Sequence, residues 1–185
     1  MDANNVTTGV RRSLGGVYRA PIGTTLPTDA DTALDAAFKD QGYISEDGVT
    51  KSYSIDTTEI REWAGTLVHK LQTNKDITVQ FKELETLNIE AIKAVYGDDN
   101  VTGTLETGIS VTENDVQPEE AVWVIDMVCL DGTLERSVYP RAVISDMGDQ
   151  VFKRDEAVAY DITLSALADS SNNKVYTYYK AAESE

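Results

Sequence analysis

The chain has 185 residues, 41% hydrophobic and 26% charged, which is the composition of a cored globular protein and excludes a disordered chain. Thirty-two acidic against sixteen basic residues give a formal charge of −16. Because phosphate binding depends on Lys and Arg that displace counterions, this balance argues against a protein that binds nucleic acid or anionic membranes. The first residues lack the apolar segment of a signal peptide, and no run approaches eighteen apolar residues, so we expect no secretion signal and no membrane span.

Residues 1–20 are polar and lack a sustained period, and they hold a local basic pair, Arg11 and Arg12. We interpret them as an N-terminal arm that is flexible in the monomer and orders against a partner. A frayed terminus without a role is the equal alternative. Residues 21–185 are then predicted to form one β domain, since no linker or internal repeat divides them.

A helix, a hairpin and a strand are expected next. Thr28 is placed to cap a short helix that runs to about Asp40, with acidic residues near its positive end. The turn Glu46-Asp47-Gly48 then predicts a hairpin whose second strand runs from Thr50 to Asp56. A further strand is expected from Ile60 to Thr73, followed by a turn at Thr73-Asn74-Lys75.

The segment from Asp76 to Gly97 is the most informative. Ile77, Val79 and Phe81 alternate with polar residues, which is the pattern of a strand with one buried face. From Asn88, a candidate N-cap, the apolar period changes to that of a helix that ends at Gly97. We therefore predict a long strand that leads into a short helix.

The remainder is β-patterned. The most hydrophobic strand is expected at Ala121–Leu130, in the centre of the sheet, with a hairpin turn at Asp131-Gly132. Further strands are expected at residues 134–145, 156–167 and 174–180, with a weak edge strand or loop at 101–112 and an exposed connection at 113–120. The fold class is mainly β, an antiparallel sandwich or barrel with one flanking helix and the short helix near the N-terminus.

Candidate chemistry is sparse. His69 lies among apolar neighbours in a predicted strand, and Cys129 lies inside an apolar run, so both are interpreted as structural. One histidine and one cysteine do not assemble an ordinary zinc site, and no calcium loop or phosphate-binding loop is present. We expect no catalytic residues, no metal and no cofactor.

Three segments carry a resemblance to a known family: residues Ala20–Ala30, residues Phe38–Gly48, and the strand-to-helix unit Thr78–Gly97. Together they cover roughly the first hundred residues, and the β-rich remainder is compatible. The chain resembles the major tail proteins, or tail tube proteins, of long-tailed bacteriophages with non-contractile tails.

That resemblance implies a structural virion protein without enzymatic activity. The implied subunit is a β-sandwich that forms hexameric rings, and the rings stack into a tube around a lumen that conducts DNA without binding it specifically. The implied partners are other copies of the chain, a tape-measure protein, and tail terminator and tip proteins. The protein would reside in the virion tail, and in the host cytoplasm during assembly.

Two sets of residues are candidates for this role. The polar face of the strand at 156–167, with Asp161, Thr163 and Ser165, is a candidate lumen wall, although an outer solvated face fits the pattern equally. The candidate contacts between rings lie in the arm and in the hairpin: Arg11, Arg12, Tyr18, Glu46, Asp47, Tyr53 and Asp56.

Two other functions stay open at this stage. The first is a monomeric β-sandwich, either a binding module or a tail-completion protein, which would not self-associate. The second is an enzyme that uses some of the many acidic residues.

Overall fold

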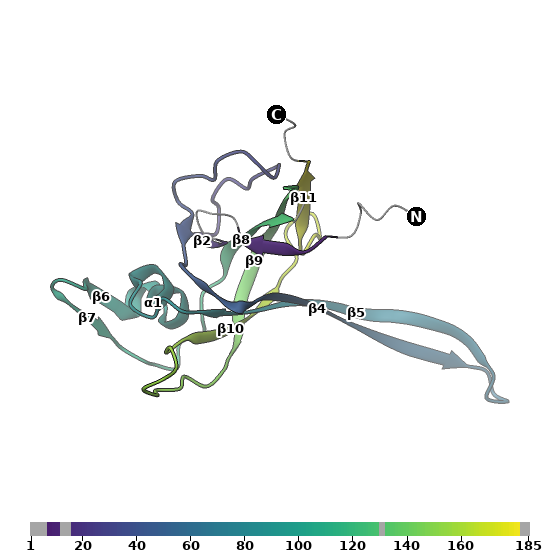
Figure 1. Cartoon of the computed structure of the whole chain (residues 1–185). Helices are drawn as coiled ribbons and strands as arrows, with labels where there is room; N and C mark the ends of the chain where they lie inside the picture. The colour runs from purple at the N-terminus through teal and green to yellow at the C-terminus, as the bar shows by residue number, and fades with distance from the viewer. Residues whose placement is uncertain (1–6, 12–15, 130–131, 182–185) are drawn as a thin grey trace.

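The computed structural model describes residues 7–11, 16–129 and 132–181. It is mainly β, as predicted, and within the described residues it is built on one sheet of nine strands, all paired antiparallel. The strand order is β3-β2-β8-β9-β10-β5-β4, with β1 paired to β8 and β11 paired to β9. Figure 1 shows a curled body from which the β4–β5 hairpin projects far to one side.

The strands of this sheet are β1 (Gly9–Arg11), β2 (Val17–Pro21), β3 (Lys39–Asp40), β4 (Ile44–Arg61), β5 (Leu67–Glu83), β8 (Ala121–Cys129), β9 (Leu134–Met147), β10 (Tyr160–Ala166) and β11 (Tyr176–Lys180). A helix, α1 (Ile89–Tyr96), follows β5, and a short 3₁₀ turn, η2 (Asp98–Asn100), follows α1. A separate small hairpin consists of β6 (Val101–Thr104) and β7 (Gly108–Val111). No helix among the described residues is long and apolar enough to cross a membrane.

Strand β8 lies in the middle of the sheet and is buried on both faces, as its continuous hydrophobic run predicts. Its odd-numbered residues, Trp123 and Ile125, belong to the main core with residues of β5, β9, β10 and α1. Its even-numbered residues, Val122 and Val124, belong to a second cluster on the opposite face. The period of two along one strand thus divides the apolar side chains between two cores.

The predicted strand-to-helix unit is confirmed. Val79 and Phe81 of β5 are buried in the main core, and the Phe81 ring lies 6.0 Å from that of Trp123. Asn88 caps α1, because its side-chain oxygen accepts a hydrogen bond of 3.0 Å from the backbone N–H of Glu90. The helix ends at Gly97, whose φ of 92° favours glycine.

The short helix expected at residues 28–40 does not form, and this prediction is wrong. The Asp29 carboxylate accepts hydrogen bonds from the backbone N–H groups of Asp31 and Thr32 and from the Thr32 hydroxyl, which folds the chain into a local turn. These bonds, led by that from the Thr32 hydroxyl, lower the pKa of Asp29. The loop at residues 22–38 instead packs Leu26, Leu34 and Phe38 against the second face of the sheet.

A buried ion pair fixes that loop. Arg136 on β9 lies directly opposite Asp126 on β8, and its guanidinium donates two hydrogen bonds, of 2.7 and 2.8 Å, to the Asp126 carboxylate. The Nη1 of Arg136 donates further hydrogen bonds to the backbone carbonyls of Asp29 and Thr32. The Asp29 carbonyl would accept an intrahelical bond if a helix began at Thr28, so Arg136 stabilises the loop in place of the helix.

Two other boundaries differ from expectation. Residues 17–20, assigned to the flexible arm, belong to β2, and Val17 is fully buried in the main core. The predicted turns at residues 46–48 and 73–75 do not reverse the chain, because both lie inside long strands as irregularities in the β4–β5 pairing. The reversal falls at residues 62–66, between the two strands. The reason is that both strands extend beyond the core, where no buried face marks their course in the sequence.

We predict that Arg136→Ala destabilises the fold by about 3–5 kcal/mol, because it leaves the Asp126 carboxylate buried without its partner and releases the two loop carbonyls. Urea unfolding followed by far-UV circular dichroism measures the change. Arg61→Ala is the matched control, since the Arg61–Glu59 pair is exposed on the projecting hairpin and should contribute less than about 1 kcal/mol. Equal effects of the two substitutions would contradict the role given to Arg136.

Candidate assembly surfaces

The projecting part of the β4–β5 hairpin is the most unusual surface of the molecule. Every residue from 52 to 76 is exposed, and we call this segment the hairpin arm. At about 3.3 Å per residue, residues 52–61 extend roughly 30 Å beyond the core. An isolated two-stranded hairpin is at best marginally stable in water, so the length of the arm indicates a surface that is completed by another molecule.

The hairpin arm carries large apolar side chains that its own domain does not cover. They are Tyr53, Ile55, Ile60, Trp63, Leu67, Val68 and Leu71. Trp63, in the turn at the tip, is fully exposed. Apolar side chains gathered on one projection are typical of a contact surface for another protein.

The inner part of the hairpin arm continues the core-facing side of the sheet. Lys51, Tyr53 and Ile55 alternate along β4, and their partners on β5 are Val79, Ile77 and Lys75. Val79 and Ile77 are buried in the main core, whereas Tyr53 and Ile55 lie beyond it. The ammonium groups of Lys51 and Lys75 each lie 5.7 Å from the centre of the Tyr53 ring.

The candidate lumen residues lie together on one polar face. Asp161, Thr163 and Ser165 of β10 pair with Lys82, Gln80 and Thr78 of β5, and all six side chains point away from the main core. Gln80 donates a hydrogen bond of 3.1 Å to the Asp161 carboxylate. The next strand of the sheet, β4, continues this face with Thr50 and Ser52, which pair with Gln80 and Thr78. The face is hydroxyl-rich, and the charged side chains among these residues are Asp161 and Lys82. Its role as a lumen wall stays a prediction.

The other predicted contact residues fall in separate places. The backbone of Arg11 pairs with Met127 of β8, and Arg12 lies outside the described residues. Tyr18 is half-buried in β2 and packs against the second core, so it is part of the fold. Tyr53 and Asp56 lie on the hairpin arm, where sequence analysis expected a contact surface.

Glu46 and Asp47 lie at the base of the hairpin instead. The β4 residues between Ile44 and Val49 form a large bulge. Ile44 pairs with Glu83 and Val49 pairs with Phe81, so residues 45–48 of β4 lie opposite the single residue 82 of β5. Gly48 adopts a φ of 70° in this bulge, a value that favours glycine. The bulge presents both carboxylates to solvent.

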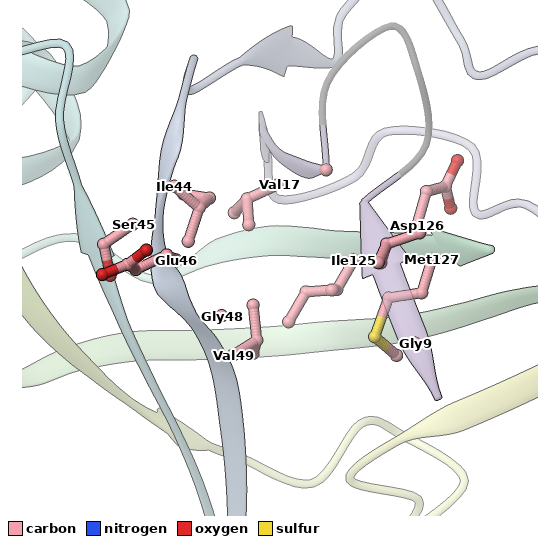
Figure 2. Close-up of a pocket in the computed structure, with 12 residues that line it drawn as sticks. Gly9, Val17, Ile44, Ser45, Glu46, Gly48, Val49, Ile125, Asp126 and Met127 are labelled. Carbon is pink, nitrogen blue, oxygen red and sulfur yellow. The ribbon is translucent and has the colours of Figure 1, made fainter. Parts of the chain in front are cut away.

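A small apolar cavity lies beside this bulge, and we call it the slot. Its volume is about 270 Å³. Figure 2 shows Ile44 and Val49 of β4 on one side and Val17, Ile125 and Met127 of β2 and β8 on the other. The slot lies between β4 and the β1–β2 side of the curled sheet, and Glu46, an exposed residue of the bulge, is among the residues that line it.

Glu83, at the end of β5, is a buried acid that sequence analysis missed. It is fully buried, and neither of its carboxylate oxygens has a hydrogen-bond partner among the described residues. Burial, and secondarily the charge of Glu85, raises its pKa from 4.5 to about 8. The sequence indicates this burial, because Glu83 is the next residue in the inward-facing alternation of Ile77, Val79 and Phe81.

Within the described ranges, no group of three or more His, Cys, Asp and Glu side chains is arranged to hold a metal ion. The long apolar arm of this mainly β body is a surface suited to contact with another protein. A family model described as phage tail tube protein matches residues 2–184 of the chain. The chain therefore belongs to the phage tail tube protein family, and it is a structural component of a phage tail.

No curated protein matches the chain. One similar solved structure is a cryo-EM structure of the anti-feeding prophage cap, described as a tube terminating cap. It is 12% identical, the match covers 98% of this chain and 99% of that chain, and the TM-score is 0.47. A likeness this weak supports no conclusion about function.

We predict that the free energy of unfolding falls by roughly 3 kcal/mol between pH 5 and pH 8 because of Glu83 alone. The pKa of Glu83 is about 8 in the folded chain and near 4.5 in the unfolded chain, so the unfolded chain releases the proton first as the pH rises. The stability that protonation provides is complete below the unfolded pKa and is lost as the pH approaches the folded value.

Glu83→Gln removes this component, because the amide does not ionise. The difference in unfolding free energy between the variant and the wild type should therefore grow in favour of the variant from pH 5 to pH 8. Urea unfolding at several pH values measures it, and Glu46→Gln, at an exposed position, is the control. Parallel pH profiles for wild type and Glu83→Gln would show that Glu83 is ionised in the folded chain.

Proposed function

We propose that this chain forms hexameric rings that stack into the tube of a phage tail, and that the lumen of the tube conducts DNA. Family membership supports the tube, and the exposed hairpin arm is the observation that supports stacking. In this proposal the arm of each copy contacts a copy in the adjacent ring. The contacts predicted at Tyr53 and Asp56 belong to the same proposal.

The edges of the sheet support lateral association within a ring. β4 ends the strand order, and no strand among the described residues pairs with its outer edge. A long unpaired edge is an aggregation hazard, and a sheet that continues from copy to copy removes it. If the sheet closed around a ring, the backbone N–H and C=O groups on the outer edge of β4 would pair with a neighbouring copy, and no separate element would be needed to cover them.

The polar face of β10, β5 and β4 is the proposed lumen wall. Among the residues named for this face the one cation is Lys82, which lies opposite Asp161, and the others carry hydroxyl or amide groups, so they offer DNA no cluster of cations to bind. A wall of this kind lets a polyanion slide, because tight phosphate binding needs Lys and Arg. We further propose that the tube assembles in the host cytoplasm with a tape-measure protein and with terminator and tip proteins.

Shortening the hairpin arm should separate folding from assembly. Ile55 and Lys75 are direct partners, so replacing residues 56–74 with the two-residue turn Asn-Gly closes the hairpin with favourable geometry. The main core is untouched, and we expect a folded protein with a similar melting temperature. We also expect no stacked tubes by negative-stain microscopy under conditions in which the wild type forms them.

The control for this variant is Leu105→Ala, which truncates an exposed apolar side chain at the tip of the β6–β7 hairpin. It should leave tube formation unchanged. Tubes of normal length from the shortened protein would contradict the role of the arm in stacking. A wild-type chain that stays monomeric at every concentration, by mass and microscopy, would contradict the tube itself.

Asp161→Lys tests the lumen wall. Assembled tubes of this variant should retain a short double-stranded DNA at low salt and release it as salt rises, because each new cation adds a phosphate contact. The DNA retained by pelleted tubes is measured by fluorescence, and the wild type should retain little. Asp99→Lys, at an exposed position beside α1, is the control. Equal retention by both variants would place Asp161 on an outer surface.

A further inference from the structure

One long stretch of the chain carries no cation. Residues 94–135 contain ten acidic residues and no Lys, Arg or His, whereas no other stretch between two successive Lys or Arg residues holds more than four acids. Six of the ten acids lie in η2 or in the connection at residues 112–120, where every residue from 112 to 117 is exposed. This part of the surface attracts cations and repels the rest of an acidic chain.

These acids surround a groove, which we call the acidic groove. Its volume is about 510 Å³, and it lies between η2 and the connection at residues 113–119, with the C-terminal end of α1 as part of its wall. The negative end of the helix dipole adds to the attraction for a cation there. Val116 and Met147 are exposed in the groove and contribute apolar surface. The groove therefore suits a partner that brings a cation together with an apolar or aromatic group.

The connection supplies carboxylates that are available to such a partner. None of the described residues that line the groove is a cation. Asp98 of η2 is already paired with Arg19, at 2.9 Å. Glu113 and Glu119 are exposed and form no ion pair with any described residue. A cation from another molecule would meet these two carboxylates without displacing a partner.

The base of the hairpin arm carries cations that match this demand. The ammonium groups of Lys51 and Lys75 each lie 5.7 Å from the centre of the Tyr53 ring, and we call these three residues the lysine–tyrosine patch. The side-chain interactions of both lysines are with aromatic rings, and neither pairs with a carboxylate in the described part of the chain. Tyr53 is 58% exposed, so the patch offers an aromatic face between two charges.

The acids of the arm lie away from the patch. The hairpin arm as a whole has a net charge of −1. However, Asp56 and Asp76 alternate with the patch residues along β4 and β5, so their side chains lie on the opposite face of the hairpin. On that face Lys174 pairs with Asp76. Glu135 of β9 accepts a hydrogen bond of 3.2 Å from the Tyr179 hydroxyl and pairs with neither lysine.

The two surfaces lie apart on one copy. Figure 1 shows α1, whose end borders the acidic groove, on one side of the body, and the hairpin arm leaving the body towards the other side. Complementary surfaces at different places on the same chain produce a head-to-tail contact, which forms a ring if the rotation between copies closes. A second copy is therefore the partner that this distribution of charge favours.

We propose that the lysine–tyrosine patch of one copy binds the acidic groove of a neighbouring copy, with Lys51 and Lys75 facing Glu113 and Glu119 of that copy. This inference rests on the proposed function and names a contact within the ring. It is separate from stacking by the outer part of the arm, because the patch remains when residues 56–74 are replaced by a turn.

A charge swap in the full-length chain tests the contact. Lys75→Glu, at an exposed position, and the double change Glu113→Lys with Glu119→Lys each place like charges opposite one another. Each should raise the protein concentration needed for assembly roughly tenfold or more at low salt, measured by sedimentation. Combining all three changes restores opposite charges, so assembly should return to within about threefold of the wild type. Melting temperatures verify that every variant is folded.

The matched control is Arg154→Glu, an exposed position on the β9–β10 loop with the same change in net charge as Lys75→Glu. Combined with Glu113→Lys and Glu119→Lys, it gives a chain of the same net charge as the triple swap. This control combination should not restore assembly. Equal recovery with Arg154→Glu and with Lys75→Glu would show that net charge alone governs assembly, and it would overturn the contact.

Cross-linking provides a second readout that needs no substitution. A carbodiimide joins a lysine to a carboxylate only where the two groups touch. In tubes assembled from a mixture of ¹⁴N- and ¹⁵N-labelled chains, mass spectrometry should find Lys51 or Lys75 of one copy joined to Glu113 or Glu119 of another. The cross-link should be absent from dilute monomer.

The outcomes separate this contact from the proposed function. Tubes that form normally from Lys75→Glu and give no such cross-link would overturn the contact and leave the tube intact. A wild-type chain that never self-associates would overturn both. Recovery specific to the swap with Lys75, together with the mixed-isotope cross-link, would establish the contact.

Discussion

The ion pair between Arg136 and Asp126 is the interaction on which the arrangement of the body depends. It lies across the two central strands, which fixes their register, and its remaining donors hold the loop at residues 22–38 over the second face of the sheet. That loop buries Val122 and Val124 of β8. Without it, the most hydrophobic strand of the chain would expose one face to water.

The centre of the sheet is therefore covered on both faces, and the surfaces that remain uncovered lie at the margin of the body. β4 has an open outer edge within the described part of the chain, the slot opens between β4 and the β1–β2 side, and the hairpin arm extends beyond both cores. These features share one strand, β4, which runs from the slot at Ile44 to the base of the turn at Arg61.

Glu83 lies where β4 and β5 leave the body, and its burial makes ionisation of its carboxyl group unfavourable. Its neighbours include Ile44, which pairs with it and also lines the slot. Protonation of the carboxyl group removes this penalty, since a neutral group tolerates burial better than a charge. The stability of the arm's base is thus linked to pH through a residue that no side chain in the described ranges neutralises.

Local sequence determined the mainly β class, the central strand at residues 121–129 and the strand-to-helix unit capped by Asn88 and Gly97. These follow from periods and caps that act over a few residues. Family membership was also foreseen, from segments in the first hundred residues. That residues 28–40 form a loop depends also on the tertiary structure. The local turn at Asp29 is held by Arg136, a hundred residues away, which donates hydrogen bonds to the carbonyls of Asp29 and Thr32. The tertiary structure likewise decided the extent of the hairpin arm, since a strand exposed on both faces carries no pattern that marks where it ends.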